Sequence, residues 1–162
     1  MTVVASLVMG RDGSTTPSRL ISNTIDQADF RSRRKLVDCI LIGGNTARTE
    51  KYENTPVPLV VLTRNSAAFK GSNVKATYLS LEPSEAITQC RALHGTNIGV
   101  EVGPHLLLEM LNAHLIDELH LTITDKTGAS DIHSPDKFLI GLQIETDVNH
   151  DGTRLIVARR QR

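Results

Sequence analysis

The stretch Cys39-Ile40-Leu41-Ile42-Gly43-Gly44-Asn45-Thr46 decides the fold. Its first four residues form an unbroken apolar run, which is typical of a strand that is buried on both faces of a sheet. Two glycines follow immediately and end the run. Such a strand predicts a mainly parallel sheet covered by helices, and ligands of these sheets bind beyond the carboxyl ends of the strands.

Strands and helices alternate on both sides of this stretch. Strand patterns occupy residues 3–8, 57–63, 75–81, 97–102 and 116–124. Helices are predicted from a capping box at Thr24, over 84–93, and from Gly103-Pro104 onward. The segment 9–23 has no hydrophobic period and is expected to be a loop. Two further strands, at 138–148 and 153–158, flank the hairpin signal Asp151-Gly152.

These patterns predict an α/β fold, with a mixed, mostly parallel sheet flanked by helices and a C-terminal antiparallel hairpin. We expect a single domain over residues 1–162. Lys+Arg and Asp+Glu both number 18, so the formal net charge is zero. That balance argues against nucleic acids and membrane surfaces as partners. The first residues lack a basic signal region and no apolar run reaches bilayer length, so a cytoplasmic protein with reduced cysteines is expected.

Two glycine turns follow apolar strands, at Gly43-Gly44 and at Gly103-Pro104-His105. Glycine lets the backbone approach a ligand, and free amides at a helix start favour an anion such as phosphate. Either turn alone is equally well explained as a glycine that only the chain reversal requires. Together they favour a ligand with two anionic groups, such as a dinucleotide.

An arginine ends a third strand, where Arg64 follows Thr63. A guanidinium beside a hydroxyl is what a 2′-phosphate needs, although Arg64 is also explained as an exposed loop residue. The six histidines, at 94, 105, 114, 120, 133 and 150, do not fall at a metal-ligand spacing, so no metal site is predicted. The adjacent acids Asp117 and Glu118 point to opposite sides of a strand and are expected to be structural.

Several blocks together resemble a known family, the riboflavin-biosynthesis reductase domain, which is the C-terminal half of the bifunctional pyrimidine deaminase/reductase. The resemblance covers about residues 3 to 125. Its blocks are Ile21-Ser22, Asp26, Phe30, Arg34, Leu36, Asp38, Gly43, Thr46, Arg48, Glu50, Tyr52, the run Val100 to Leu106, and Leu115 to Leu119.

The resemblance implies a dihydrofolate-reductase-like fold, a homodimer, NADPH as cofactor and a small-molecule substrate. The family reduces the ribosyl group of 5-amino-6-(5-phosphoribosylamino)uracil, or its 2,5-diamino relative, to a ribityl chain. Carried over by position, the cofactor contacts are Val4, Leu20, Thr46, Glu50, Thr63, Gly103, Pro104, His105 and Leu106. The turn and the strand end described above add Gly43, Gly44 and Arg64. The substrate contacts are Ser18, Arg34 and Glu101.

Glu101 is the expected catalytic residue, because a carboxylate at a strand end can favour positive charge on an imine nitrogen that accepts hydride. It is also explained as an acid that stabilises the following helix start. Arg34 is expected to bind the substrate phosphate and is also explained as a cation near a helix end.

The chain departs from the family at two places. The family's Ser-Leu-Asp-Gly-Lys reads Ser6-Leu7-Val8-Met9-Gly10 here, and only a shifted Asp12-Gly13 could replace the acid and glycine. A phosphate-anchoring stretch is replaced by Glu50-Lys51-Tyr52-Glu53-Asn54, which leaves Lys51 or Arg48 to serve. A reductase of another heterocyclic substrate and a non-catalytic dinucleotide-binding protein therefore remain alternatives.

Overall fold

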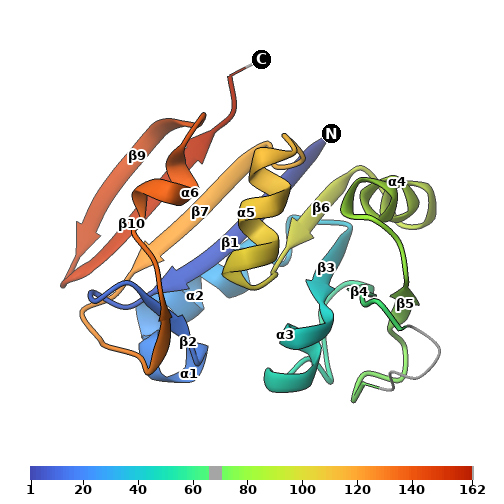
Figure 1. The fold of residues 1–162 in the computed structure, drawn as a ribbon, viewed down its shortest axis with the longest axis horizontal. Coiled ribbons are helices and arrows are strands. Elements are labelled where there is room, and N and C mark those ends of the chain that lie inside the picture. Colours follow the sequence, from blue (N-terminus) through green and yellow to red (C-terminus); the bar gives the residue numbers. More distant parts are fainter. Residues whose placement is uncertain (66–70, 162) are drawn as a thin grey trace.

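A computed structural model describes residues 1–65 and 71–161. Within these residues an eight-stranded sheet runs in the order β5-β4-β3-β6-β1-β7-β10-β9 (Figure 1). The strands from β5 to β7 in this order are parallel, and β10 and β9 are antiparallel. Their bounds are β1 Thr2–Met9, β3 Cys39–Gly43, β4 Leu59–Leu62, β5 Thr77–Leu79, β6 Asn97–Val100, β7 Glu118–Ile123, β9 Gln143–His150 and β10 Thr153–Arg159.

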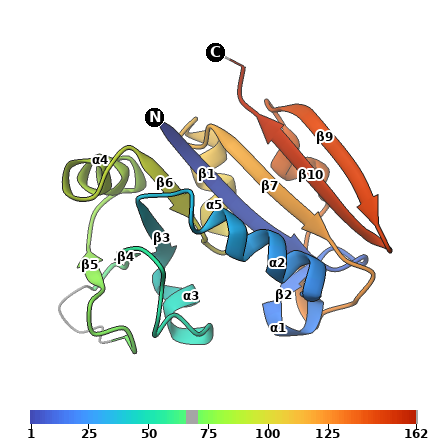
Figure 2. The same ribbon diagram turned by 180° about the vertical axis from the view of Figure 1, so that it is seen from behind.

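Helices cover both faces of the sheet. Figure 2 shows α2 (Thr24–Arg33) crossing one face in front of β1, while α4 (Pro83–Leu93), α5 (Pro104–Asn112) and α6 (Asp136–Leu139) lie on the other. The larger core lies under α4 and α5, where alternate residues of β1 such as Val3 and Ala5 are buried. Their intervening neighbours are half-buried toward α2, as the two-residue period of a strand requires.

The predicted fold class is confirmed. The apolar stretch at 39–42 forms β3, which is buried along its whole length between β4 and β6. The hairpin between β9 and β10 turns at Asp151 and Gly152, whose φ values of 49° and 83° suit a two-residue turn of the mirror-image type. Cys39 and Cys90 are free thiols, as expected, and both are buried.

The segment 9–23 is the main difference from the sequence prediction. It contains β2 (Ser14–Thr16) and the one-turn helix α1 (Ser18–Ile21). β2 pairs with β8 (Ser130–Ile132), which also was not predicted. Neither short strand has a hydrophobic period. Each is held instead by its pairing with a partner that lies more than a hundred residues away in sequence. A local pattern therefore cannot reveal them.

Two element boundaries also differ. Asn23, and not Thr24, caps α2, since its side-chain oxygen accepts from the Asp26 amide at 2.9 Å. The predicted strand at 138–148 begins only at Gln143, because Phe138 belongs to α6 and is fully buried in the core. None of the described helices is long and apolar enough to span a bilayer.

Candidate functional site

The two glycine turns lie side by side at the carboxyl ends of β3 and β6. The strands are hydrogen-bonded neighbours, and the Glu101 amide donates to the Leu41 carbonyl at 2.9 Å just before the second turn. A Cβ built on Gly43 would lie 3.4 Å from Leu106, and one built on Gly44 would lie 3.1 Å from the Thr63 hydroxyl. The structure thus joins both predicted turns and Thr63 into one surface, which we call the glycine cradle (Gly43, Gly44, Thr63 and residues 103–106).

Gly103 is the open part of the glycine cradle. It precedes α5 with a φ of −64°, and no atom of the described residues lies within 4 Å of where its Cβ would be. None of the described side chains caps this helix start, and Pro104 occupies the first turn. The unpaired amides of a first turn and the helix dipole favour an anion here.

Three basic residues lie on or next to the segments of the glycine cradle. The Arg48 side chain donates to Asn45 at 2.6 Å and lies 3.4 Å from the Cβ position of Gly44. Arg64 is exposed directly after β4, and its carbonyl accepts from the Ser80 hydroxyl at 2.9 Å. His105 is exposed on the first turn of α5. The surroundings suit a ligand with negative charge.

The remaining predicted cofactor residues lie in three different places. Thr46 is in α3 (Gly44–Thr49), and Glu50 follows it, donating its amide to the Thr46 carbonyl. Val4 lies in mid-strand on the α2 face, paired with Gly99 and away from the glycine turns. Leu20 is a partly exposed residue of α1. The structure therefore does not bring Val4 to the glycine cradle.

Glu101 and Arg34, both predicted to contact substrate, bind each other. Arg34 donates from Nε and Nη2 to the two carboxylate oxygens of Glu101 at 2.8 and 2.5 Å. The Tyr52 hydroxyl donates to the same carboxylate at 2.6 Å. The Arg34 guanidinium also lies over the rings of Phe30 and Tyr52, at 4.3 and 5.0 Å from their centroids. We call Arg34, Glu101 and Tyr52 the charge cluster.

The side chains of the charge cluster are largely buried, so each one changes the pKa of its neighbours. The Glu101 side chain is 6% exposed and that of Arg34 is 17% exposed. Burial, and then the charge of Glu101, raise the pKa of Tyr52 well above its ordinary value, so its hydroxyl keeps its proton. Burial acts to lower the pKa of Arg34, but the hydrogen bonds and charge of Glu101 outweigh it and raise the pKa. The cluster therefore holds one negative and one positive charge that balance each other.

A cavity of about 310 Å³ opens between α2 and the sheet, beside the charge cluster. Val4, Ser6, Phe30 and Gly99 are among its lining residues. Ser18, the third predicted substrate residue, begins α1, which packs on β1 and β2 at the carboxyl end of the sheet (Figure 1).

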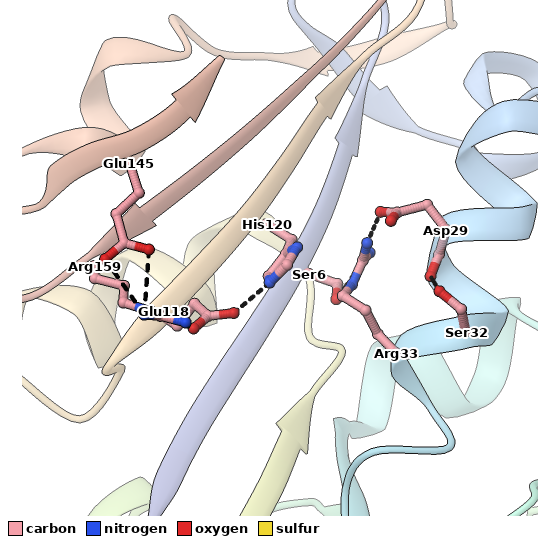
Figure 3. A network of polar contacts seen from close by, with 8 residues as sticks. All are labelled: Ser6, Asp29, Ser32, Arg33, Glu118, His120, Glu145 and Arg159. Carbon is pink, nitrogen blue, oxygen red and sulfur yellow. Dashed lines mark hydrogen bonds and ion pairs between the residues drawn. The ribbon is translucent and has the colours of Figure 1, made fainter. Parts of the chain in front are cut away.

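The wall of this cavity carries a second polar network, drawn in Figure 3. Arg33 of α2 pairs with Asp29 and donates to the Ser6 hydroxyl at 3.3 Å. Burial lowers the pKa of Arg33 to about 10. Across β1, His120 hydrogen-bonds to Glu118, which also accepts from Arg159 Nε at 2.6 Å.

Glu118 has the most perturbed carboxyl of this network. The hydrogen bond from His120 and a second from Arg159 hold its pKa at about 2, well below the ordinary value, against the opposite effect of burial. Its sequence neighbour Asp117 points elsewhere and accepts from the Val3 amide at 2.8 Å. The expectation that these two acids are structural and do not form a dyad agrees with this geometry.

Sequence reasoning missed three residues that the fold brings to the candidate sites. Tyr52 belonged to the family resemblance, but nothing in its sequence neighbourhood links it to Glu101. Asp131 and His133 approach His105 only because β2 and β8 pair, so no ligand spacing could have shown them. The prediction of no metal site stays a prediction, and this cluster bears directly on it.

Comparisons with known proteins support the fold. No curated protein matches the chain. A protein from Shewanella sp. PV-4 whose name assigns it to riboflavin biosynthesis is 16% identical with a TM-score of 0.71, and all of both chains is covered. A pyrimidine reductase-like protein from Corynebacterium diphtheriae is 19% identical with a TM-score of 0.72 and coverages of 99% and 92%.

A larger protein shares the same fold over part of its length. This is the diaminohydroxyphosphoribosylaminopyrimidine deaminase/5-amino-6-(5-phosphoribosylamino)uracil reductase of Thermotoga maritima, at 14% identity and a TM-score of 0.72. The comparison covers 99% of our chain but 56% of that protein. The model of the RibD C-terminal domain matches residues 2–128, which confirms the resemblance seen in the sequence. The chain thus belongs to the RibD C-terminal domain family.

Proposed function

We propose that this protein is an NADPH-dependent reductase of riboflavin biosynthesis. Its substrate would be 5-amino-6-(5-phosphoribosylamino)uracil or the 2,5-diamino relative, whose ribosyl group becomes a ribityl chain. Membership of the RibD C-terminal domain family supports a reductase role in that pathway. The single observation that carries the proposal is the glycine cradle, in which two glycine turns adjoin at neighbouring strand ends.

The residues of the glycine cradle fit a dinucleotide. A side chain at Gly44 would press on Thr63, whereas the space at Gly103 is open to a ligand. We assign the Gly43-Gly44 turn and residues 103–106 to the pyrophosphate and nearby ribose, and the exposed Arg64 to the 2′-phosphate. NADPH would supply the hydride, and the protein's task is to hold the sugar carbon against it.

The charge cluster supplies the electrostatics of the proposed reaction. We assign Glu101 to favour positive charge at the substrate nitrogen as the open-chain sugar imine accepts hydride. Arg34 and Tyr52 act as positioning residues, because they hold both carboxylate oxygens in place. Since Arg34 already balances Glu101, its role toward the substrate phosphate requires that one guanidinium serve both anions.

The test is incubation with NADPH and the aminouracil ribosyl phosphate. We expect the nicotinamide absorbance to decay and a ribityl product to appear, with heat-denatured protein as the blank. Arg64→Ala should weaken NADPH binding by about tenfold to a hundredfold and leave NADH binding unchanged, since a single charge-assisted phosphate contact is worth roughly 1.5–3 kcal/mol. Arg31→Ala, an exposed arginine of α2, is the matched control. Equal binding of NADH and NADPH by the unaltered protein would refute the role of Arg64.

A second candidate, reduction of another heterocyclic substrate, is favoured by the loop after β1. Asp12 could replace the family's missing acid only if it were available, but it accepts from the Ser14 hydroxyl and amide at 2.5 and 3.1 Å. These hydrogen bonds hold its pKa below the ordinary value. Clear stabilisation by NADPH without turnover of the aminouracil would favour this candidate, or a non-catalytic dinucleotide-binding protein.

We also propose that a second copy of this chain is the partner, as the family resemblance implies. Figure 2 shows none of the described helices in front of β9 and β10. Leu155 of β10 pairs in register with Val148 of β9, so their side chains lie on the same face. Val157 is two residues beyond Leu155 in β10 and pairs with His120 of β7, so its side chain points to that face as well. Sedimentation of the unaltered protein should give a dimer, and Val157→Asp should give a folded monomer. A monomer at every concentration would overturn this part of the proposal.

A further inference from the structure

Outside the charge cluster, three side chains with metal-binding chemistry converge beside the first turn of α5. His105 is the second residue of α5, Asp131 lies in β8, and His133 follows one residue after that strand. One oxygen of Asp131 lies 2.9 Å from Nε2 of His105 and 2.8 Å from Nε2 of His133. The three potential ligand atoms all lie within 4.8 Å of one another.

The pairing of β2 and β8 fixes two of these three residues, Asp131 and His133. The Thr15 hydroxyl donates to the Asp131 carbonyl at 2.8 Å, and the His133 amide donates to the Gly13 carbonyl at 2.9 Å. The His133 side chain is 9% exposed, and its ring packs edge-on against Phe138 at 5.7 Å. Asp131 and His133 therefore form a rigid half of the cluster before any ligand arrives.

The backbone of Asp131 helps to fix the position of its side chain. Its φ of 56° lies in the left-handed region, which costs a residue with a side chain free energy. Gly13 permits the close approach, since a Cβ there would lie 2.3 Å from the His133 carbonyl oxygen and its φ is 84°. Aspartate adopts this conformation more readily than most residues, so the contacts with Gly13 and Thr15 are sufficient to hold it.

We propose that His105, Asp131 and His133 bind a divalent transition-metal cation, with Zn²⁺ as the representative ion. Two imidazole nitrogens and one carboxylate oxygen are a ligand set that zinc accepts, at about 2.0–2.2 Å from each atom. A tetrahedral site of that size separates ligand atoms by roughly 3.3 Å. The observed 2.8 and 2.9 Å are hydrogen-bond distances, about 0.4–0.5 Å shorter than this value, so both imidazoles would shift slightly away from Asp131 when the ion binds. The His105 side chain is 76% exposed and has room to rotate.

The exposed side of His105 leaves a fourth position for water. A bound ion would add a link between α5 and the segment after β7, which already contact each other through the hydrogen bonds to Asp131, the edge-on rings of His105 and His133, and the packing of α5 against α6. The inference goes beyond the proposed reductase function and does not depend on it. Its test therefore uses the metal alone, without cofactor or substrate.

The experiment is a calorimetric titration of the chelator-treated full chain with ZnCl₂, repeated with CoCl₂ to record the absorption bands of a tetrahedral ion. We expect one ion per chain and a rise of the thermal midpoint with added Zn²⁺. His105→Ala and His133→Gln should each weaken binding by tenfold or more. His150→Ala, an exposed histidine at the end of β9, is the matched control and should bind as the unaltered protein does.

Three results would overturn the proposal. They are no stoichiometric binding by the unaltered protein, binding that is unchanged in His105→Ala and His133→Gln, and binding that is lost in His150→Ala. Because the His133 side chain is only 9% exposed, circular dichroism must show that His133→Gln is folded. If it is not, the exposed His105→Ala decides the question alone.

Discussion

The glycine cradle and the charge cluster meet at residues 101–103, yet they are built in opposite ways. The cradle consists of glycines and backbone amides at strand ends, and the space around Gly103 is open. The charge cluster consists of long side chains from three separate segments, and each charge in it has a partner. The cradle offers its polar groups to a ligand, whereas the polar groups of the charge cluster already bind one another.

This difference assigns the two regions different tasks. A buried ion pair contributes little net stability when it is intact, but removal of one partner strands the other charge in a place without water. A glycine turn contributes little to stability but decides how closely a ligand approaches. Substitutions should therefore separate the two regions in the protein without ligand, where those in the charge cluster change stability and those in the cradle do not.

The largest expected effect is that of Glu101→Ala. Arg34 would keep a buried, uncompensated charge, so we expect a loss of about 3–5 kcal/mol in the free energy of unfolding, measured by urea denaturation. The double variant Arg34→Met/Glu101→Leu should recover most of this loss because it removes both charges. A single variant that is as stable as the unaltered protein would show that the pair is accessible to water.

Gly103→Val should act on binding alone. The φ of −64° suits valine, and no described atom lies within 4 Å of the new Cβ, so we expect the thermal midpoint to stay within about 2 °C. NADPH affinity measured by calorimetry should fall at least tenfold, which is about 1.4 kcal/mol. Ala92→Val, on an exposed position of α4, is the control and should leave both quantities unchanged.

Glu118 gives the network in Figure 3 a pH dependence. Its folded pKa of about 2 lies below the ordinary 4.5, so its contribution to stability is complete above about pH 4.5 and is lost as the pH falls toward 2. Urea denaturation between these pH values should show the loss. Glu118→Gln should flatten that part of the profile, and an unchanged profile would contradict the assignment.

The smallest effect is expected for the exposed pair of β9 and β10. Arg154 binds Asp147 through two hydrogen bonds of 2.8 and 2.6 Å, but both side chains are more than a third exposed. We expect Asp147→Ala to cost less than about 1 kcal/mol, and the difference to shrink as salt is added. A loss of stability as large as that of Glu101→Ala would show that burial does not explain the difference between the two ion pairs.

The sequence was sufficient wherever the signal was local. The apolar run at 39–42 and the glycines that follow it predicted a buried parallel strand and its turn, and the hairpin residues Asp151-Gly152 predicted the last two strands. The pattern also places both glycine turns at the carboxyl edge of the sheet, but only the observed strand order shows that β3 and β6 are neighbours.

The charge cluster and the metal-binding cluster could not be predicted because their members are remote in sequence. Arg34 and Glu101 are 67 residues apart, and Tyr52 lies 49 residues from Glu101. Their contact depends on how α2 and the chain after α3 fold over the sheet. Likewise, His105 meets Asp131 only through the pairing of two three-residue strands that have no hydrophobic period.

The most direct test of the central claim is a crystal structure of the protein with NADPH. The account predicts that the pyrophosphate lies between the Gly44 turn and the Gly103 turn, with the 2′-phosphate within hydrogen-bond distance of Arg64. A dinucleotide bound instead in the cavity under α2, or over the exposed face of β9 and β10, would contradict it.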